Sequence, residues 1–385
     1  MGMLMNRLLT SEQRRDFARR GFSRRMFGRL AALAGAGAAL PFYNEPALAQ
    51  LSTFSRIPPG AVRLNANENP LGPCPEALEA IQAVARNGGR YLFEMTWDLA
   101  ETLTAPTGLK RDYVEVYGGS SDPLHHTVLG FCSPTRPFVV ADPGYEAGAR
   151  AAGFIHAPVI NVPLTAGYSH DVKRMAAAHA SPGVIYVCNP NNPTGTLTPR
   201  TDIDWLVANK PAGSIVLLDE AYIHFTTAPQ CLDLVARDQE LILLRTFSKI
   251  YGLAGLRAGA AFARPDLLAK IKGFKSGLLS TTGMAGAAAS LKVPGLIEQR
   301  RTYLTDIREE TFAWLRTRNY DFVPSTSNKF MLNVHRPGPE VVKALAARNI
   351  YVGRSWPVWP THLRVTIGTR EEMAKFQAAL REVVG

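Results

Sequence analysis

Short apolar runs, each followed at once by a polar, glycine-containing or proline-containing turn, recur along the chain between about residues 110 and 265. Uninterrupted apolar runs of this length are typical of strands that are buried on both faces. Segments of helix length, such as 145–153 and 200–209, separate them. This alternation predicts an α/β fold with a large domain whose mainly parallel sheet is flanked by helices. The expected strands are 113–117, 138–140, 184–187, 215–218 and 241–244.

The last hundred residues follow a different pattern. A charged helical stretch at 299–318 is followed by a strand-like run at 329–334, a helix near 339–348 and a strand at 363–367. These elements predict a smaller α+β domain. We therefore expect an N-terminal segment, 50–84, that joins the small domain, a large domain, 85–285, and a small C-terminal domain, 286–385.

The first 49 residues have the pattern of an export signal. The pair Arg24-Arg25 precedes an 11-residue run of small and apolar residues, 30–40, and an Ala47-Leu48-Ala49 sequence follows. This order predicts a twin-arginine signal peptide cleaved after Ala49, hence contact with the twin-arginine export machinery and a periplasmic mature protein. A permanent membrane anchor is not expected, because a spanning helix needs about 20 apolar residues. The alternative is an amphipathic N-terminal helix.

Composition and charge agree with a soluble enzyme-sized chain. The 385 residues are 46% hydrophobic and 19% charged, as in ordinary globular proteins. Of the net charge of +11, residues 1–49 contribute +5, so the remaining +6 gives no reason to expect nucleic-acid binding. The four cysteines show neither zinc nor C-x-x-C spacing, and the histidines show no ligand spacing; no metal is predicted.

Polar groups follow the ends of three neighbouring predicted strands. Lys249 comes after the last strand, Asp219 and Tyr222 after the preceding one, and Asn192 after the strand before that. Because ligands bind at the carboxyl ends of parallel strands, we expect these groups to converge on one site. An amine beside a phenol, a carboxylate and anion-binding groups suits Schiff-base chemistry with an aldehyde cofactor.

Several motifs occur in a fixed order along the chain. They are Asn67-Glu68-Asn69-Pro70-Leu71-Gly72-Pro73, Asn191-Asn192-Pro193-Thr194-Gly195, Asp219-Glu220-Ala221-Tyr222, Thr246-Phe247-Ser248-Lys249, Gly255-Leu256-Arg257 and the Leu-Arg-x-Thr-x-Gly-Thr-Arg-Glu-Glu pattern at 363–372. This ordered set resembles the motifs of the fold type I aminotransferases that depend on pyridoxal 5'-phosphate (PLP), most closely the histidinol-phosphate aminotransferase branch. The resemblance implies a PLP cofactor and transfer of an amino group between an amino donor and a keto acid or aldehyde acceptor. It also implies a homodimer.

The resemblance also implies a role for each matching residue around the reacting end of the cofactor. Lys249 would bind the cofactor aldehyde and move the proton at the substrate carbon. Asp219 would keep the pyridine nitrogen protonated, and Tyr222 and Asn192 would bind the phenolic oxygen. Tyr145 would stack on the ring.

The remaining implied contacts concern the phosphate and the substrate. Arg364 would hold the substrate α-carboxylate with its two-pronged guanidinium, and Arg354 would contact the distal end of the substrate. The phosphate would be held by a helix start and by nearby donors. Those residues are Ser121, Asp122, Thr246, Ser248, Arg257 and, reaching across from the partner subunit, Tyr91.

Two other functions remain open at this point. PLP-dependent decarboxylases and lyases of the same fold share these motifs, and a noncatalytic periplasmic binding protein could retain the fold. Within the aminotransferase hypothesis we expect the physiological substrate not to be histidinol phosphate, because histidine synthesis draws on cytosolic intermediates whereas Arg24-Arg25 and the cleavage sequence direct this chain outward.

Overall fold

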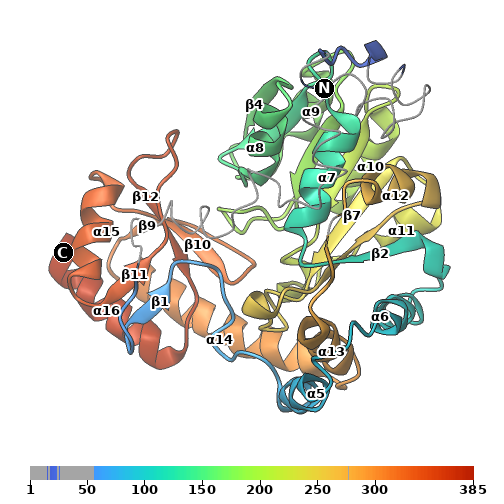
Figure 1. Ribbon diagram of the computed structural model, residues 1–385. Helices are drawn as coiled ribbons and strands as arrows, with labels where there is room; N and C mark the ends of the chain where they lie inside the picture. The colour runs from blue at the N-terminus through green and yellow to red at the C-terminus, as the bar shows by residue number, and fades with distance from the viewer. Residues whose placement is uncertain (1–14, 16–17, 24–25, 27–55, 276) are drawn as a thin grey trace.

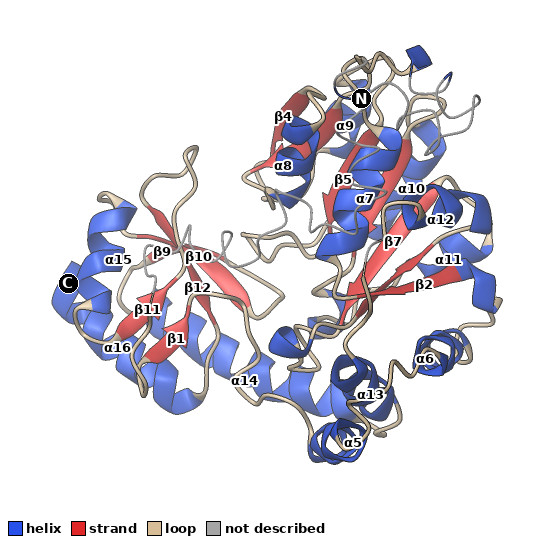
Figure 2. Ribbon diagram, viewed as in Figure 1, coloured by secondary structure: helices blue, strands red, loops and turns tan. Residues whose placement is uncertain are grey.

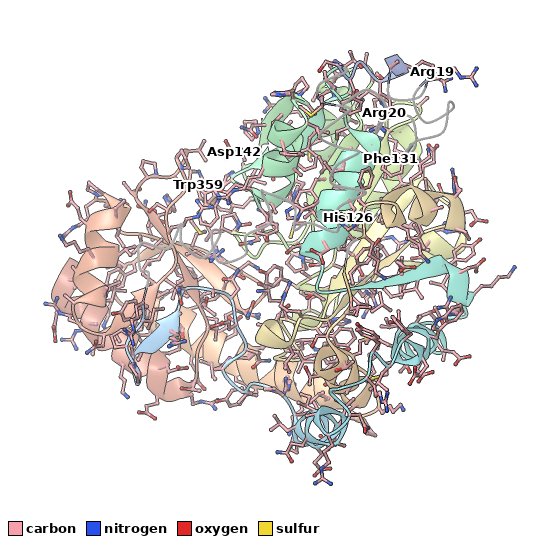
Figure 3. The ribbon with its side chains drawn as sticks, viewed as in Figure 1. Arg19, Arg20, His126, Phe131, Asp142 and Trp359 are labelled. Carbon is pink, nitrogen blue, oxygen red and sulfur yellow. The ribbon has the colours of Figure 1, made fainter. Side chains whose placement is uncertain are left out.

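The computed structural model describes residues 15, 18–23, 26, 56–275 and 277–385. The predicted signal features, Arg24-Arg25, the apolar run 30–40 and the cleavage site at Ala49, lie outside the described residues. Across the described ranges, no helix combines the length and apolarity that a membrane crossing requires. Figure 3 labels Arg20 close to α7 (Ser121–Phe131), and its guanidinium donates hydrogen bonds to the carbonyl oxygens of Leu129 and Cys132.

A seven-stranded sheet forms the centre of the larger body, as Figure 2 shows. Only β8 runs against the other strands, so the predicted mainly parallel sheet is confirmed. Every residue of β5 and β6 is buried, which explains why their sequences are uninterrupted apolar runs. In spatial order the strands are β2 (Val114–Tyr117), β8 (Gly259–Phe262), β7 (Leu241–Thr246), β6 (Ile215–Asp219), β5 (Val184–Cys188), β3 (Phe138–Asp142) and β4 (Val159–Pro163).

Two strands of this sheet, β4 and β8, were not predicted. The β8 sequence Gly-Ala-Ala-Phe has low strand propensity, and its place is set by antiparallel pairing with β2 and β7. The β4 strand lies at the sheet edge, and its mixed burial gives no continuous apolar run.

Helices lie on both faces of the sheet (Figure 1). The predicted helix 200–209 coincides with α10 (Arg200–Asn209), and the segment predicted at 145–153 contains α8 (Ala147–Phe154). The others are α7, α9 (Val172–Ala177), α11 (Leu232–Ala236) and α12 (Pro265–Lys272), with short 3₁₀ turns at η1 (Arg111–Tyr113), η2 (Ile223–Phe225) and η3 (Ala254–Leu256).

The smaller body contains two further sheets. Strands β9 (Asp321–Val323), β10 (Lys329–Asn333) and β12 (His362–Thr366) form an antiparallel sheet in the order β12-β10-β9. Strand β1 (Val62–Leu64), from the N-terminal segment, pairs in parallel with β11 (Ile350–Val352). Helices α15 (Gly338–Ala346) and α16 (Arg370–Val384) accompany them, and a capping box between Thr369 and Glu372 begins α16.

A long helix connects the two bodies, and three further helices pack together beside the larger one. In Figure 1, α14 (Leu296–Arg316) runs from the larger body to the smaller one, below the space between them. Helix α13 (Thr281–Leu291) packs against α5 (Pro75–Ala85) and α6 (Glu94–Thr104). The domain limits proposed from the sequence stay predictions.

Candidate active site

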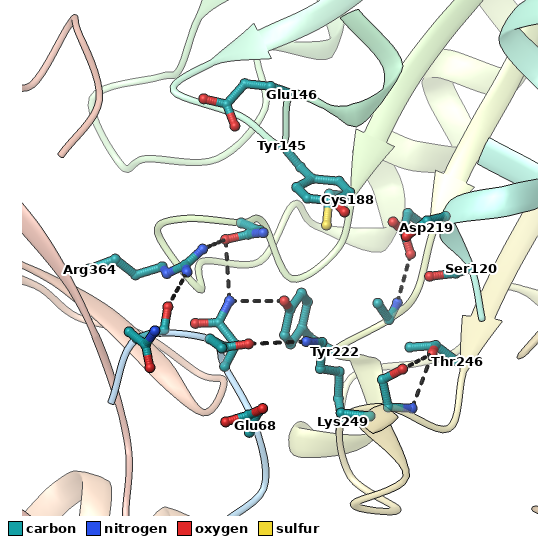
Figure 4. Close-up of a pocket in the computed structure, with 18 of the residues that line it drawn as sticks. Glu68, Ser120, Tyr145, Glu146, Cys188, Asp219, Tyr222, Thr246, Lys249 and Arg364 are labelled. Carbon is teal, nitrogen blue, oxygen red and sulfur yellow. Dashed lines mark hydrogen bonds between the residues drawn. The ribbon is translucent and has the colours of Figure 1, made fainter. Parts of the chain in front are cut away.

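A cavity of about 610 Å³ opens at the carboxyl edge of the large sheet and is closed by residues of the smaller body. Strands β5, β6 and β7 end at Cys188, Asp219 and Thr246, so the loops that follow them share this edge. Figure 4 shows the side chains. Among the predicted site residues, those that line the cavity are Ser121, Tyr145, Asn192, Asp219, Tyr222, Thr246, Ser248, Lys249, Arg257, Arg354 and Arg364.

Two predicted site residues are not among the lining residues. Asp122 is the second residue of α7, and its carboxylate lies on the Gly118 side of the turn, 3.4 Å from where a Cβ at Gly118 would stand. Tyr91 lies between α5 and α6 with 68% of its surface exposed. Within one chain, Tyr91 therefore does not contribute to the cavity.

Lys249 reaches the cavity from the turn after β7. Its Nζ donates a hydrogen bond to the carbonyl oxygen of Ala66 at 3.4 Å and lies 5.7 Å from the centre of the Tyr222 ring. Ala66 belongs to the N-terminal segment, so this segment forms the wall opposite the sheet (Figure 4).

Asp219 is the last residue of β6 and is only 3% exposed. Burial raises the pKa of its carboxyl to about 6, although hydrogen bonds and nearby positive charge oppose the rise. The phenol of Tyr186 donates to Oδ2 at 2.9 Å, and the backbone N–H of Ala221 donates to Oδ1 at 3.0 Å. Two fixed donors thus orient a carboxylate whose charge lacks a full partner in the protein.

Tyr222 and Asn192 are connected through Asn67. The amide nitrogen Nδ2 of Asn67 donates to the phenolic oxygen of Tyr222 at 3.0 Å and approaches Oδ1 of Asn192 at 3.5 Å. Because burial raises the pKa of Tyr222, its phenol stays protonated. Since Asn67 is the donor in this bond, the Tyr222 hydroxyl hydrogen is left to donate to another oxygen.

The end of the cavity near α7 carries the donor set that a phosphate requires. The Thr246 hydroxyl donates to Ser248 Oγ at 2.9 Å, and Nη1 of Arg257 donates to the same Oγ at 3.2 Å. Ser120 and Ser121 stand at the N-terminus of α7, where backbone N–H groups and the helix dipole favour an anion. Gly119 leaves room for this arrangement, because a Cβ there would lie 2.3 Å from Arg257. These residues fit the phosphate of PLP.

The opposite end of the cavity is rich in arginine. Arg364 on β12 donates through Nη1 to Oδ1 of Asn192 at 3.0 Å and through Nη2 to the carbonyl oxygen of Asn65 at 2.7 Å. Nη2 of Arg354 donates to both carboxylate oxygens of Glu146, and the Arg354 guanidinium carbon lies 4.0 Å from the centre of the Trp356 ring. Both arginines belong to the smaller body, whereas Glu146 precedes α8 in the larger one.

Sequence reasoning missed several residues that build this site. Asn67 was noted only as part of a motif, and Tyr186, Glu146 and Trp356 were given no role. Tyr186 carries a usable signal: a tyrosine in the middle of a fully buried strand needs a partner for its hydroxyl. Glu146 and Trp356 meet Arg354 only through the tertiary fold, which no local pattern encodes.

Comparison with known proteins agrees with this fold and site. Residues 59–380 match the family model described as "Aminotransferase class I and II". The chain therefore belongs to the class I and II aminotransferase family. It is a PLP-dependent aminotransferase.

Within this family, the chain is similar to several histidinol-phosphate aminotransferases. The chain is 33% identical over 331 residues to the histidinol-phosphate aminotransferase of Moorella thermoacetica, covering 84% of this chain and 85% of that protein. It is 33% identical over 329 residues to the same enzyme of Symbiobacterium thermophilum, with 84% and 91% covered. The structure of histidinol-phosphate aminotransferase from Sinorhizobium meliloti in complex with pyridoxal-5'-phosphate has the same fold: TM-score 0.77 and 24% identity, covering 90% of this chain and 95% of that one. These comparisons favour transamination over the decarboxylase, lyase and binding-protein alternatives.

Proposed function

We propose that this chain transfers the amino group of an α-amino acid or a related donor, with Lys249 as the proton-moving residue. The observation that carries the proposal is the convergence of Lys249, Asp219 and Tyr222 on one cavity, from the ends of neighbouring strands. When bound, PLP supplies an electron-withdrawing ring that stabilises negative charge at the substrate carbon. The protein has to hold that ring, place the substrate and move a proton.

Asp219 and the Tyr222 pair would set the polarity across the cofactor. The buried carboxylate favours a proton on the pyridine nitrogen, since a pyridinium supplies the positive partner that Asp219 lacks. On the other side, the Tyr222 hydroxyl and the amide of Asn192 would donate to the phenolic oxygen. Tyr145, which lines the same cavity, would cover one face of the ring.

The phosphate would lie between the start of α7 and Arg257. Ser120, Ser121, Thr246 and Ser248 supply hydroxyl donors there, and the Arg257 guanidinium supplies charge. Asp122 would act through the turn at Gly118 and not by direct contact with the cavity.

Arg364 would receive the substrate carboxylate. Its two terminal guanidinium nitrogens already donate to Oδ1 of Asn192 and to the carbonyl oxygen of Asn65 on one side, which fixes the plane of the group. A fixed fork can make two parallel bonds to a carboxylate. Arg354 and Trp356 would face the substrate side chain, with Glu146 as the competing partner of Arg354.

The test of this function is chemical trapping at Lys249. We expect borohydride reduction of the holoenzyme to attach the cofactor permanently to Lys249, as located by peptide mass spectrometry. Lys249→Ala should fold, retain noncovalent cofactor through the phosphate contacts, and lose turnover. The matched control is Lys270→Met on α12, a lysine outside the cavity lining, which should behave as wild type. Attachment to a different lysine would overturn the assignment.

We further propose that the mature enzyme is a periplasmic homodimer. The dimer proposal is supported by Tyr91, Phe93 and Trp97, which expose 68%, 60% and 59% of their surfaces. In the dimer, Tyr91 would reach the phosphate of the partner subunit. Export would follow from Arg24-Arg25 and the cleavage sequence that ends at Ala49, and an exported enzyme would act on a substrate other than histidinol phosphate.

A further inference from the structure

Lys329, the first residue of β10, has no exposed surface. Its Nζ donates a hydrogen bond to Ser327 Oγ at 2.9 Å and lies 3.2 Å from the centre of the Tyr222 ring. Tyr222 lines the cavity, whereas Lys329 is not among the lining residues. The amine therefore contacts the site through the face of the Tyr222 ring.

A lysine in this position is costly, which calls for a reason other than packing. Lysine is almost never fully buried without a partner, and an apolar residue would fill the same place on β10 at no electrostatic cost. Burial holds the pKa of the Lys329 amine well below its usual range, and the cations Arg364 and Lys249 act in the same direction. The carboxylate of Asp219 opposes them.

A bound cofactor would change the balance of charges that act on the Lys329 amine. Around the cavity, Arg354 is neutralised by Glu146, so Lys249, Arg257 and Arg364 face the buried carboxylate of Asp219 and the exposed Glu68. A phosphate ester adds about two negative charges at neutral pH. With that charge in place, a protonated Lys329 would be held by the Tyr222 ring face, which attracts a cation, and by the Ser327 hydroxyl oxygen, which accepts its hydrogen bond.

We propose that Lys329 is a positioning residue for the reaction: its ammonium, packed behind Tyr222, fixes the phenol toward the cofactor and makes the nitrogen of Lys249 release its proton more readily. This inference rests on the proposed role of Lys249. It adds a second lysine to the site, one that neither touches substrate nor binds the cofactor.

The experiment compares the pH dependence of the bound cofactor's absorbance in wild type, Lys329→Met and Lys329→Gln. Methionine keeps the length of the side chain, and glutamine keeps a donor for Ser327. We expect the midpoint in both variants to rise by about one pH unit, the shift that loss of a unit charge within about 10 Å produces at an effective dielectric constant of about 20. The control, Lys270→Met, removes a lysine that lies 5.2 Å from the centre of the Phe131 ring outside the cavity lining, and its midpoint should not move.

Each outcome decides whether Lys329 affects the proton on the Lys249 nitrogen or only supports the fold. An unchanged midpoint in folded, cofactor-loaded variants would overturn the proposal, since Lys329 would then carry no charge that the site feels. Failure of both variants to fold would also overturn it, because it would assign Lys329 to the core. If wild type is labelled by borohydride at a lysine other than Lys249, the proposed function itself fails, and this result is visible before any variant is compared.

Discussion

Asp219 is a buried carboxyl whose raised pKa makes the stability of the cofactor-free protein depend on pH. Its folded-state pKa of about 6 lies above the value of about 3.9 for an aspartate in an unfolded chain. The folded cofactor-free protein thus binds this proton more tightly than the unfolded chain does. As the pH rises from about 4 to 6, ionisation of Asp219 lowers the free energy of unfolding, and the loss persists above pH 6.

We predict that Asp219→Asn stabilises the cofactor-free protein at pH 7 by up to about 3 kcal/mol, because asparagine avoids the buried charge. At pH 4 the two proteins should unfold at the same denaturant concentration, since Asp219 is then protonated in the wild type. The same variant should lose activity far more than it loses cofactor content. Denaturant unfolding at both pH values gives the measurement, with the exposed Asp306→Asn as control. A stability difference that does not depend on pH would contradict this account.

The sequence predicts a site residue when the pattern that indicates it lies within a few neighbouring positions. Asp219 ends strand β6, and Tyr222 and Lys249 follow the ends of β6 and β7 by three residues, so the apolar run of each strand indicates their place. Lys329 also begins a strand, yet nothing local indicates that it packs on Tyr222, 107 positions away along the chain. Asn67 was likewise hidden, since its partners Tyr222 and Thr366 are 155 and 299 positions distant.

At the scale of elements, the turn between β2 and α7 determines how a phosphate would be held. Gly119 has φ of +103°, a backbone conformation that other residues rarely adopt, and it packs directly against Arg257. The turn and the arginine therefore form one unit.

We expect Gly119→Ala to weaken PLP binding at least about tenfold, the equivalent of about 1.4 kcal/mol, because the added methyl group displaces the Arg257 guanidinium. Cofactor titration followed by fluorescence measures the effect. Gly118→Ala is the matched control: its Cβ would meet nothing closer than Asp122 Oδ2 at 3.4 Å, so binding should change little. Equal losses in the two variants would show that the turn is merely intolerant of substitution.

The sequence predicted some strands better than others, and the difference has a physical reason. Buried strands such as β5 and β6 are determined by their own apolar side chains, and they appeared close to the expected limits. Strand β8 has small residues and exists because β2 and β7 present unpaired backbone on either side of it. Its formation depends on partners distant in sequence, which a local pattern does not report.

At the scale of the whole molecule, the exposed aromatic side chains mark a candidate contact between subunits. Among the described residues, five of the large exposed hydrophobic side chains fall between positions 71 and 97, and Tyr91 and Phe93 have ring centres 5.4 Å apart. Exposed aromatic side chains that contact one another, as Tyr91 and Phe93 do, are typical of an interface.

We predict that Phe93→Glu converts the dimer to a monomer that binds cofactor more weakly, since it would separate Tyr91 from the partner's phosphate. Sedimentation velocity reports the oligomeric state. Val358→Glu, at a 48% exposed site on the smaller body, should leave the dimer intact. A wild-type protein that sediments as an active monomer would refute the proposed interface.

The proposed export also concerns the whole chain. We predict that the tagged full-length protein is recovered from the periplasm, cleaved after Ala49, and that replacing both Arg24 and Arg25 by lysine leaves it uncleaved in the cytosol. The adjacent pair Arg19-Arg20 provides the control, because the same double replacement there should not prevent processing. Periplasmic delivery of the Arg24-Arg25 variant would contradict a twin-arginine route.

The wall of the cavity is held by contacts between an early segment of the chain, near residue 65, and a late one, near residue 365. Arg364 binds the carbonyl of Asn65, and Thr366 receives the backbone N–H of Asn67; both contacts span 299 positions. During synthesis, the early segment must wait until strand β12 has left the ribosome before this wall can close. The cofactor site is therefore completed by a finished chain and not by a growing one, so cofactor binding reports that both distant parts of the chain have been synthesised and have folded together.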